Sequence, residues 1–282
     1  MTVMNGSANG GAAMRTGINY ISRANPYPRV YYVDPPVGEP LSSVQIETRE
    51  MTVRDVRGRE DGYRLAEDGF CFLPNRFDLG DLSDDDAIRA HLYPQAEALT
   101  RHMTGIEHVL AFDHGIRRRE NGQDSDGKPR SGGVQRNVAD FVHNDYIPYS
   151  AALRVRWFTG DAAETLLRRR FAIYNFWWPL AGPLHDHPLA LCVRGHRPDH
   201  FIPIENIFER GPNPIAGLAH DPAHEWIYLS GMMPDELMLF RTWDSFRALE
   251  GCIPHGAVRE PEERPDAPPR ASMELRVIAF HP

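Results

Sequence analysis

The second half of the chain carries short apolar runs of the length of β-strands. Aromatic and β-branched residues dominate these runs, and Pro, Gly and Asp separate them, which favours strands over helices. No regular alternation of helical and strand-like segments accompanies them, so a sheet of parallel strands joined by helices is not expected. The pattern predicts a mainly β domain, a barrel or a sandwich, with strands at residues 171–177, 189–193, 226–229, 237–240 and 274–280.

Two segments ahead of these runs have helical signals. The first covers residues 83–99, where apolar residues recur at helical spacing after Ser83 as the expected N-cap and three acidic residues. Pro94 is expected to kink or divide this helix. The second covers residues 161–170, with Asp161 near its start and three arginines at its end, as the helix dipole favours. Both helices are expected to support the sheet from outside.

The N-terminal part has a different composition. Residues 1–17 are small, polar and rich in glycine, which predicts a disordered lead-in. Five prolines interrupt residues 18–56, so this segment is expected to be an arm across the body, of a kind that favours a homodimer. Residues 117–135 are charged and glycine-rich, and we expect a surface loop there. Residues 18–282 are predicted to form a single domain.

Charge and composition narrow the choice of partners. The chain has 282 residues, a net charge of −8 and a pI near 5.9, so it has no overall positive field for nucleic acid. Three scattered cysteines predict neither a disulfide framework nor a thiolate zinc site, which suggests a reducing, cytoplasmic setting. No signal-peptide pattern and no apolar run long enough to cross a membrane are present. A small-molecule substrate is therefore expected.

The candidate chemistry begins with a histidine and an aspartate two residues apart. His143 and Asp145 occupy a strand-like segment, so their side chains should share one face. A second histidine would complete the two-histidine, one-carboxylate triad that holds iron(II) and leaves positions open, and we assign His255 to it. The His-x-Asp pair alone is common in ordinary sequences and needs support from other residues. Enzymes of this type that halogenate leave the carboxylate position open so that a halide ion can bind the iron there. The presence of Asp145 therefore disfavours halogenation.

Support comes from the segment after His255. Arg270 and Ser272 lie 15 and 17 residues later, just before the last predicted strand, and can hold a carboxylate through a guanidinium fork and a hydroxyl. A 2-oxo acid that chelates iron would need such a group for its distal carboxylate. Asn175 is a further candidate for a hydrogen bond to cosubstrate or substrate inside the barrel, with core packing as the alternative.

Other polar residues have plainer interpretations. His185 and His187 are separated by one residue, but the neighbouring prolines predict a loop rather than a strand face, which argues against iron binding. His224 is expected to be structural. Asp244 and Ser245 fit either a turn or support for His255.

Several motifs occur in a fixed order. They are AFDHGIRR at 111–118, VHNDY at 142–146, IYNFWWPL at 173–180, HEWIY at 224–228 and PRASMELR at 269–276. In these motifs the chain resembles the fungal hydroxylase/desaturase family, which includes the cephamycin-methoxylation J protein and gibberellin desaturase-like proteins. The resemblance implies a double-stranded β-helix (jelly-roll, cupin-like) barrel with flanking helices, and iron(II) and 2-oxoglutarate as cofactors. It also implies oxidation by O2 of a secondary metabolite or amino acid, through hydroxylation, desaturation or oxidative cyclisation.

The chain departs from the family pattern at three positions. Trp178 replaces the usual Arg, Val193 replaces an acid and Arg241 replaces Lys. If the family arginine contacts an acidic substrate group, Trp178 would indicate a flatter or more apolar substrate.

Two other functions remain open on the sequence. The same triad could hold zinc in a hydrolase, or the barrel could be a non-catalytic partner of another tailoring enzyme. An oxygenase would convert 2-oxoglutarate to succinate only with iron(II) and oxygen, whereas a hydrolase would need neither.

Overall fold

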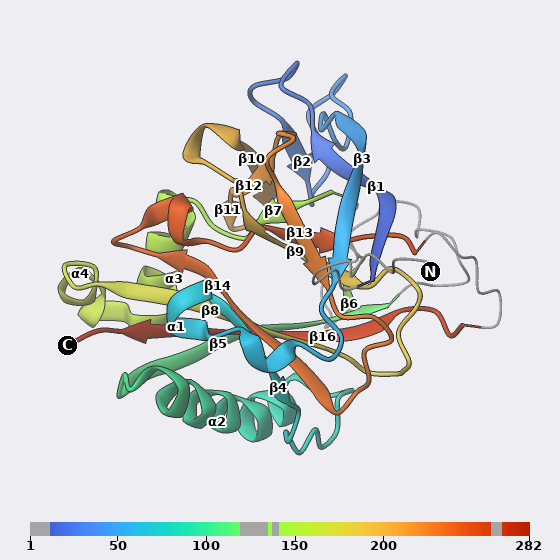
Figure 1. Cartoon of the computed structure of the whole chain (residues 1–282). Helices are drawn as coiled ribbons and strands as arrows, with labels where there is room; N and C mark the ends of the chain where they lie inside the picture. Colours follow the sequence, from blue (N-terminus) through green and yellow to red (C-terminus); the bar gives the residue numbers. More distant parts are fainter. Residues whose placement is uncertain (1–11, 119–134, 137–140, 261–266) are drawn as a thin grey trace, which may run out of the picture.

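The computed structural model describes residues 12–118, 135–136, 141–260 and 267–282, and these form two stacked β-sheets with helices outside (Figure 1). The ten-stranded sheet has the order β1-β3-β13-β9-β15-β7-β12-β10-β11, with β2 paired to β10. Its strands are β1 (Ala13–Ile21), β2 (Arg29–Tyr31), β3 (Ile46–Asp55), β7 (His143–Asn144), β9 (Leu189–Arg194), β10 (Phe201–Phe208), β11 (Gly211–Pro212), β12 (Ile215–Leu218), β13 (Glu225–Tyr228) and β15 (His255–Ala257).

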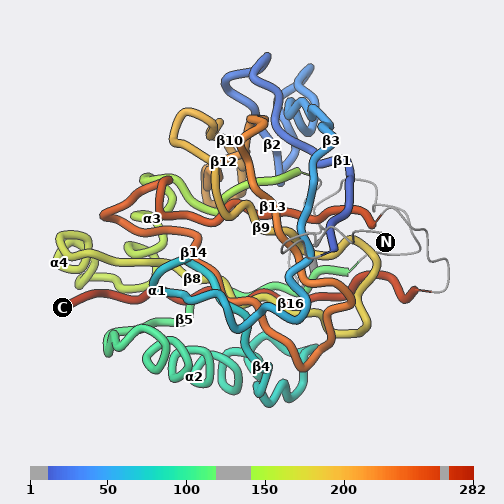
Figure 2. Tube along the Cα trace, viewed as in Figure 1, coloured from blue at the N-terminus to red at the C-terminus, as the bar shows by residue number. Residues whose placement is uncertain are grey.

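The six-stranded sheet forms the second layer, which lies below the first in Figure 2. Its order is β4-β14-β8-β16-β5-β6, from β4 (Phe70–Pro74), β5 (His108–Arg118), β6 (Gln135–Arg136), β8 (Phe171–Pro179), β14 (Glu236–Asp244) and β16 (Ala271–Phe280). The helices are α1 (Leu65–Asp68), α2 (Asp85–Thr104), α3 (Pro148–Thr159) and α4 (Ala163–Leu166), with short 3-10 turns η1 (Glu60–Gly62), η2 (Gly160–Ala162), η3 (Pro198–His200) and η4 (Ala248–Gly251). The mainly β architecture with flanking helices is confirmed, as are the five predicted strands.

Strand β8 lies in the middle of the six-stranded sheet and is buried on both faces, which explains why its sequence is apolar except for Asn175. Its even-numbered residues, including Trp178, pack in the core that the sheet shares with α2. The Trp178 ring lies 5.5 Å from that of Phe77 in this layer. Asn175 and Trp177 alternate with these residues and face the other sheet. The interpretation of Trp178 as a substrate-pocket residue is therefore wrong.

Helix α2 covers the outer face of the six-stranded sheet (Figure 1). Its N-cap is Asp84, whose Oδ1 accepts a hydrogen bond from the backbone N of Asp86 at 2.9 Å, so the assignment of Ser83 was wrong by one residue. The helix also continues through Pro94 rather than dividing there. A buried apolar face offsets the one backbone hydrogen bond that proline removes.

The second predicted helix is much shorter than expected. Only Ala163–Leu166 is α-helical, after the 3-10 turn Gly160–Ala162. A longer helix, Pro148–Thr159, was missed by the sequence analysis. Its signal was Pro148 at the first helical position, where the absent N–H costs nothing.

The expected N-terminal arm is instead part of the ten-stranded sheet. Strands β1 and β3 pair antiparallel from Ala13↔Arg54 to Ile21↔Ile46, and the prolines lie in the connection between them. The predicted lead-in to residue 17 ends too late, because β1 starts at Ala13; residues 1–11 lie outside the described part. So does most of the expected loop at 117–135. Among the described residues, no helix is long and apolar enough to cross a membrane.

Candidate metal and cofactor site

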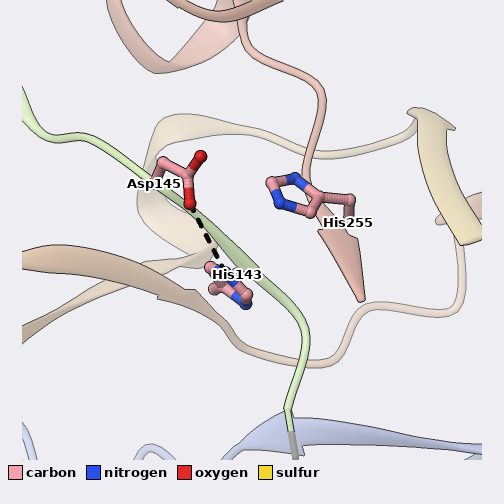
Figure 3. A group of neighbouring side chains, drawn as sticks. All are labelled: His143, Asp145 and His255. Atoms are coloured by element: carbon pink, nitrogen blue, oxygen red, sulfur yellow. Dashed lines mark ion pairs between the residues drawn. The ribbon is translucent and has the colours of Figure 1, made fainter. Parts of the chain in front are cut away.

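The predicted triad comes together between the sheets (Figure 3). His143 starts β7, Asp145 follows that strand, and His255 starts β15. Strands β7 and β15 pair antiparallel with His255 opposite His143, which joins residues 112 positions apart in sequence. One ligand atom from each of the three residues lies within 4.8 Å of the others. Among the described residues they form the only such group.

Hydrogen bonds fix which nitrogen each imidazole presents. His143 Nδ1 lies 3.0 Å from the carbonyl oxygen of Phe141, and His255 Nδ1 lies 3.1 Å from that of Ile253. A carbonyl oxygen only accepts, so both Nδ1 atoms carry a proton, and Nε2 is the nitrogen of each ring left to bind a metal. Burial also lowers the pKa of His255 to about 4, so this ring is neutral at neutral pH.

Asp145 directs one carboxylate oxygen toward the two histidines. Its Oδ1 lies 3.6 Å from His143 Nε2, whereas its Oδ2 accepts a hydrogen bond from Arg276 Nε at 3.0 Å. Burial opposes ionisation of Asp145, but Arg276, with His143 and His255, outweighs it, and together they hold the pKa of this carboxyl well below its usual range. Two imidazoles and one ionised carboxylate are a donor set that suits a divalent transition metal.

Arg270 is buried, comes immediately before β16 and is held by its surroundings. Its Nε donates to Ser272 Oγ at 3.3 Å, and its Nη1 donates to the carbonyl oxygen of His187 at 2.6 Å. The backbone N of Arg270 donates to Asp186 Oδ2 at 2.8 Å, and the guanidinium lies 5.1 Å from the ring centre of Trp177. The loop that carries Asp186 and His187 thus supports Arg270, a role that the sequence analysis missed.

The competing histidines do not join the triad. His185 Nδ1 pairs with Glu260 Oε2 at 3.1 Å, and His187 Nδ1 pairs with Asp186 Oδ1 at 2.7 Å. The expectation against iron binding by this pair agrees with these contacts.

Asp244 and Ser245 do not support His255. Asp244 accepts two hydrogen bonds from Arg170, at 2.7 and 3.2 Å, and Ser245 Oγ accepts one from the backbone N of Phe171. Arg170 therefore binds the Asp244 carboxylate.

Asn175 lies inside the barrel, opposite Arg276 in the register of β8 and β16. It is 1 % exposed, and neither its Oδ1 nor its Nδ2 has a hydrogen-bond partner among the described residues. A buried amide without partners is uncommon, and it fits a residue that awaits a polar ligand.

Strand β16 carries further polar residues that the sequence analysis missed. These are Glu274 and Arg276, which are buried, as is the predicted Ser272, and the three alternate with Met273 and Leu275, which pack in the core beneath α2. Polar residues at every second position of an otherwise apolar strand were the signal that could have revealed this inner face.

Comparisons with known proteins identify a family and several relatives of this chain. The model of a family described as "Oxidoreductase/YMDC permease-like domain" matches residues 18–280. The Fe(II)/2-oxoglutarate-dependent dioxygenase nvfI of Aspergillus novofumigatus is 27 % identical over 89 % of this chain and 90 % of its own. The hydroxylase/desaturase poxK of Penicillium oxalicum is 28 % identical over 87 % of this chain and 83 % of its own.

A solved structure shares the fold. The structure titled "iron and alpha-ketoglutarate-dependent endoperoxidase NvfI" superposes with a TM-score of 0.81 at 25 % identity, over 95 % of this chain and 98 % of that one. The expected jelly-roll fold, the resemblance to hydroxylase/desaturases and the expected class of oxygenase with its two cofactors are confirmed.

Proposed function

Because the chain belongs to the oxidoreductase/YMDC permease-like family and is similar to an iron(II)/2-oxoglutarate-dependent dioxygenase, we propose that it oxidises a small molecule with these cofactors and O2. The reaction is a hydroxylation, desaturation or oxidative cyclisation in the synthesis of a natural product. This range of expected reactions agrees with the names of similar proteins, which include hydroxylase/desaturases and an endoperoxidase. Residues 18–282 act as one oxygenase domain in this proposal.

His143, Asp145 and His255 are the proposed iron ligands. The observation that carries this assignment is the convergence of two imidazole nitrogens and one carboxylate oxygen, which lie within 4.8 Å of one another. Zinc would accept the same three ligands, but the names of the relatives favour the oxygenase.

Arg270, Ser272 and Asn175 are the proposed cosubstrate residues. Arg270 with Ser272 binds the distal carboxylate of 2-oxoglutarate, and the contacts to Asp186 and His187 keep the guanidinium in place for it. Asn175 donates or accepts a hydrogen bond toward the cosubstrate or the substrate, which gives its buried amide a partner.

The protein contributes binding and orientation to the reaction. When bound, iron(II) and 2-oxoglutarate supply with O2 the oxidant that removes hydrogen from a substrate carbon. The backbone carbonyls of Phe141 and Ile253 orient the two histidines, and the packed barrel around them excludes water from the reacting centre.

Anaerobic titration of the iron(II)-loaded protein with 2-oxoglutarate tests this proposal. The wild type should develop the weak visible charge-transfer band of the chelate. His143→Ala should abolish the band, and Arg270→Ala should shift the titration to 2-oxoglutarate concentrations at least about tenfold higher, as for loss of a charge-assisted bidentate contact.

His185→Ala is the matched control, because it removes a neighbouring histidine that pairs with Glu260. It should leave the band intact. An iron-bound wild type without the band would contradict the oxygenase proposal and favour zinc hydrolysis or simple binding. Release of succinate only in the presence of iron(II) and O2 gives an independent readout.

A further inference from the structure

Arg276 is a buried guanidinium surrounded by acidic side chains. It projects from β16 of the six-stranded sheet and is 4 % exposed. Its Nε donates to Asp145 Oδ2 at 3.0 Å, its Nη1 donates to Asp113 Oδ2 at 2.9 Å, and its Nη2 lies 3.0 Å from Glu274 Oε1. Each of its three nitrogens therefore faces a different carboxylate.

This arrangement leaves the guanidinium little freedom to turn. A guanidinium is planar, and its donors point in fixed directions, so three partners on three sides define its orientation. Glu274 is itself held by Arg117, whose Nη2 donates to Glu274 Oε1 at 2.9 Å. Arg276 is thus anchored at two sides by Asp113 and Glu274, and its third side reaches across to Asp145 on the opposite sheet.

The contact makes the two oxygens of Asp145 unequal. Oδ2 is occupied by Arg276 Nε, while Oδ1 lies on the side of the histidines, 3.6 Å from His143 Nε2. A carboxylate can bind a metal through one oxygen or through both. Because Oδ2 is engaged by Arg276, only Oδ1 is available to bind a metal together with the two histidines.

We propose that Arg276 is a positioning residue that restricts Asp145 to one metal-binding oxygen and so keeps a further coordination position open. This inference rests on the proposed function, since it requires the triad to hold a divalent metal. The open position matters because a two-histidine, one-carboxylate site works by leaving places for cosubstrate and O2. A two-oxygen carboxylate would fill one of them.

A lysine at this position separates positioning from charge. Lys keeps the positive charge but has no planar fork, so it does not bridge three carboxylates in fixed directions. Arg276→Lys and Arg276→Gln should therefore both weaken Co(II) binding to the apoprotein by about 10- to 100-fold, the usual effect of losing a partner of a metal ligand. Both should also change the visible Co(II) spectrum, which reports the coordination number.

Arg117→Gln is the matched control. It removes a cation from the same cluster, since Arg117 pairs with Glu274, but it leaves in place all three carboxylates that Arg276 itself contacts. Chemical denaturation should show a loss of stability for this variant as for Arg276→Lys. Its Co(II) affinity should stay within about threefold of wild type, and its Co(II) spectrum should be unchanged.

The outcomes distinguish this inference from the proposed function. A wild type that binds no more Co(II) than His143→Ala would overturn the metal site itself. A wild type that binds Co(II), with Arg276→Lys equal to it in affinity and spectrum, would overturn only the role of Arg276. Equal losses in Arg276→Lys and Arg117→Gln would also overturn it, by showing a general effect of charge.

Asp113→Asn provides a second route if the Arg276 variants do not fold. This change keeps Arg276 and the triad but weakens one anchor of the guanidinium. It should lower Co(II) affinity severalfold and shift the Co(II) spectrum toward that of a higher coordination number. An unchanged spectrum and affinity would contradict the positioning role.

Discussion

At the scale of single residues, the buried polar side chains inside the barrel differ in whether they have hydrogen-bond partners. Asn175 is buried with both amide atoms unpaired among the described residues. Thr242, on the neighbouring strand β14, is also fully buried, but its Oγ1 donates to the carbonyl oxygen of Ile173 at 3.3 Å. An unpaired buried amide carries a desolvation cost that a bonded hydroxyl avoids.

Replacing Asn175 should therefore have different effects on the stability of the fold and on the binding of cosubstrate or substrate. We expect Asn175→Val to leave the free energy of unfolding of the ligand-free protein unchanged or to raise it by about 1 kcal/mol, because the change removes unpaired polar atoms. The same variant should need more 2-oxoglutarate or substrate for half-maximal activity. Urea denaturation and steady-state kinetics measure the two effects.

Thr242→Val is the control for this prediction. It keeps the size and branching of the side chain but removes a bonded hydroxyl, and it should lower the free energy of unfolding by about 1 kcal/mol. A comparable loss in Asn175→Val would mean that the Asn175 amide is satisfied in the protein.

At the scale of elements, α2 shows how a single residue decides where a helix starts. Three acidic residues follow Ser83, and the structure selects Asp84 as the N-cap, with its carboxylate on the backbone N of Asp86. Ser83 Oγ instead donates to Asp81 Oδ1 at 2.7 Å, within the preceding turn. The hydroxyl is engaged locally, and the next side chain takes the cap.

Alanine substitutions should distinguish the two candidates. Asp84→Ala should lower the free energy of unfolding by about 1 kcal/mol, the usual loss for an N-cap. Ser83→Ala should change it by less than about 0.5 kcal/mol, as for most exposed positions. Chemical denaturation followed by far-UV circular dichroism measures both, and the reverse order of effects would show that Ser83 is the cap.

At the scale of the whole molecule, a buried polar chain connects the N-terminal strand to distant parts of the ten-stranded sheet. Tyr20 Oη on β1 accepts a hydrogen bond from Trp226 Nε1 at 2.8 Å and lies 3.3 Å from His224 Nδ1. His224 Nε2 lies 2.9 Å from His200 Nδ1, and His200 Nε2 lies 3.3 Å from Asp221 Oδ2. The expectation that His224 is structural agrees with these contacts.

The buried histidine of this hydrogen-bonded series, His224, should make global stability depend on pH. Burial lowers the pKa of His224 from 6.5 to about 4 in the folded protein, whereas the unfolded chain keeps the ordinary value. Between pH 4 and pH 6.5 the unfolded state binds more protons than the folded state. The free energy of unfolding therefore has its full value above about pH 6.5 and falls as the pH drops toward 4. Urea denaturation at pH 7.5 and pH 5 measures the difference.

Two histidine variants check the source of this pH dependence. His224→Gln should reduce the loss of stability between the two pH values, because the buried imidazole is gone. His102→Gln, at an exposed position of α2, should leave the loss as in wild type. If both variants keep the full loss, the effect comes from other groups.

The sequence by itself determined the features that depend on short range. The two-residue spacing of His143 and Asp145 placed both on one side of the backbone, and the apolar runs marked β8 and β16 because side chains there must be buried on both faces. Residue chemistry alone also indicated what Arg270 and Ser272 could bind. These are local properties that a single sequence carries.

The tertiary structure decided everything that depends on which strands become neighbours. The pairing of β7 with β15 brings His255 to His143, and the pairing of β1 with β3 turns a supposed arm into part of the sheet. The packing of one sheet on the other places Arg276 against Asp145. These contacts join residues far apart in the chain, and their energy comes from packing and burial that exist only once both sheets have formed.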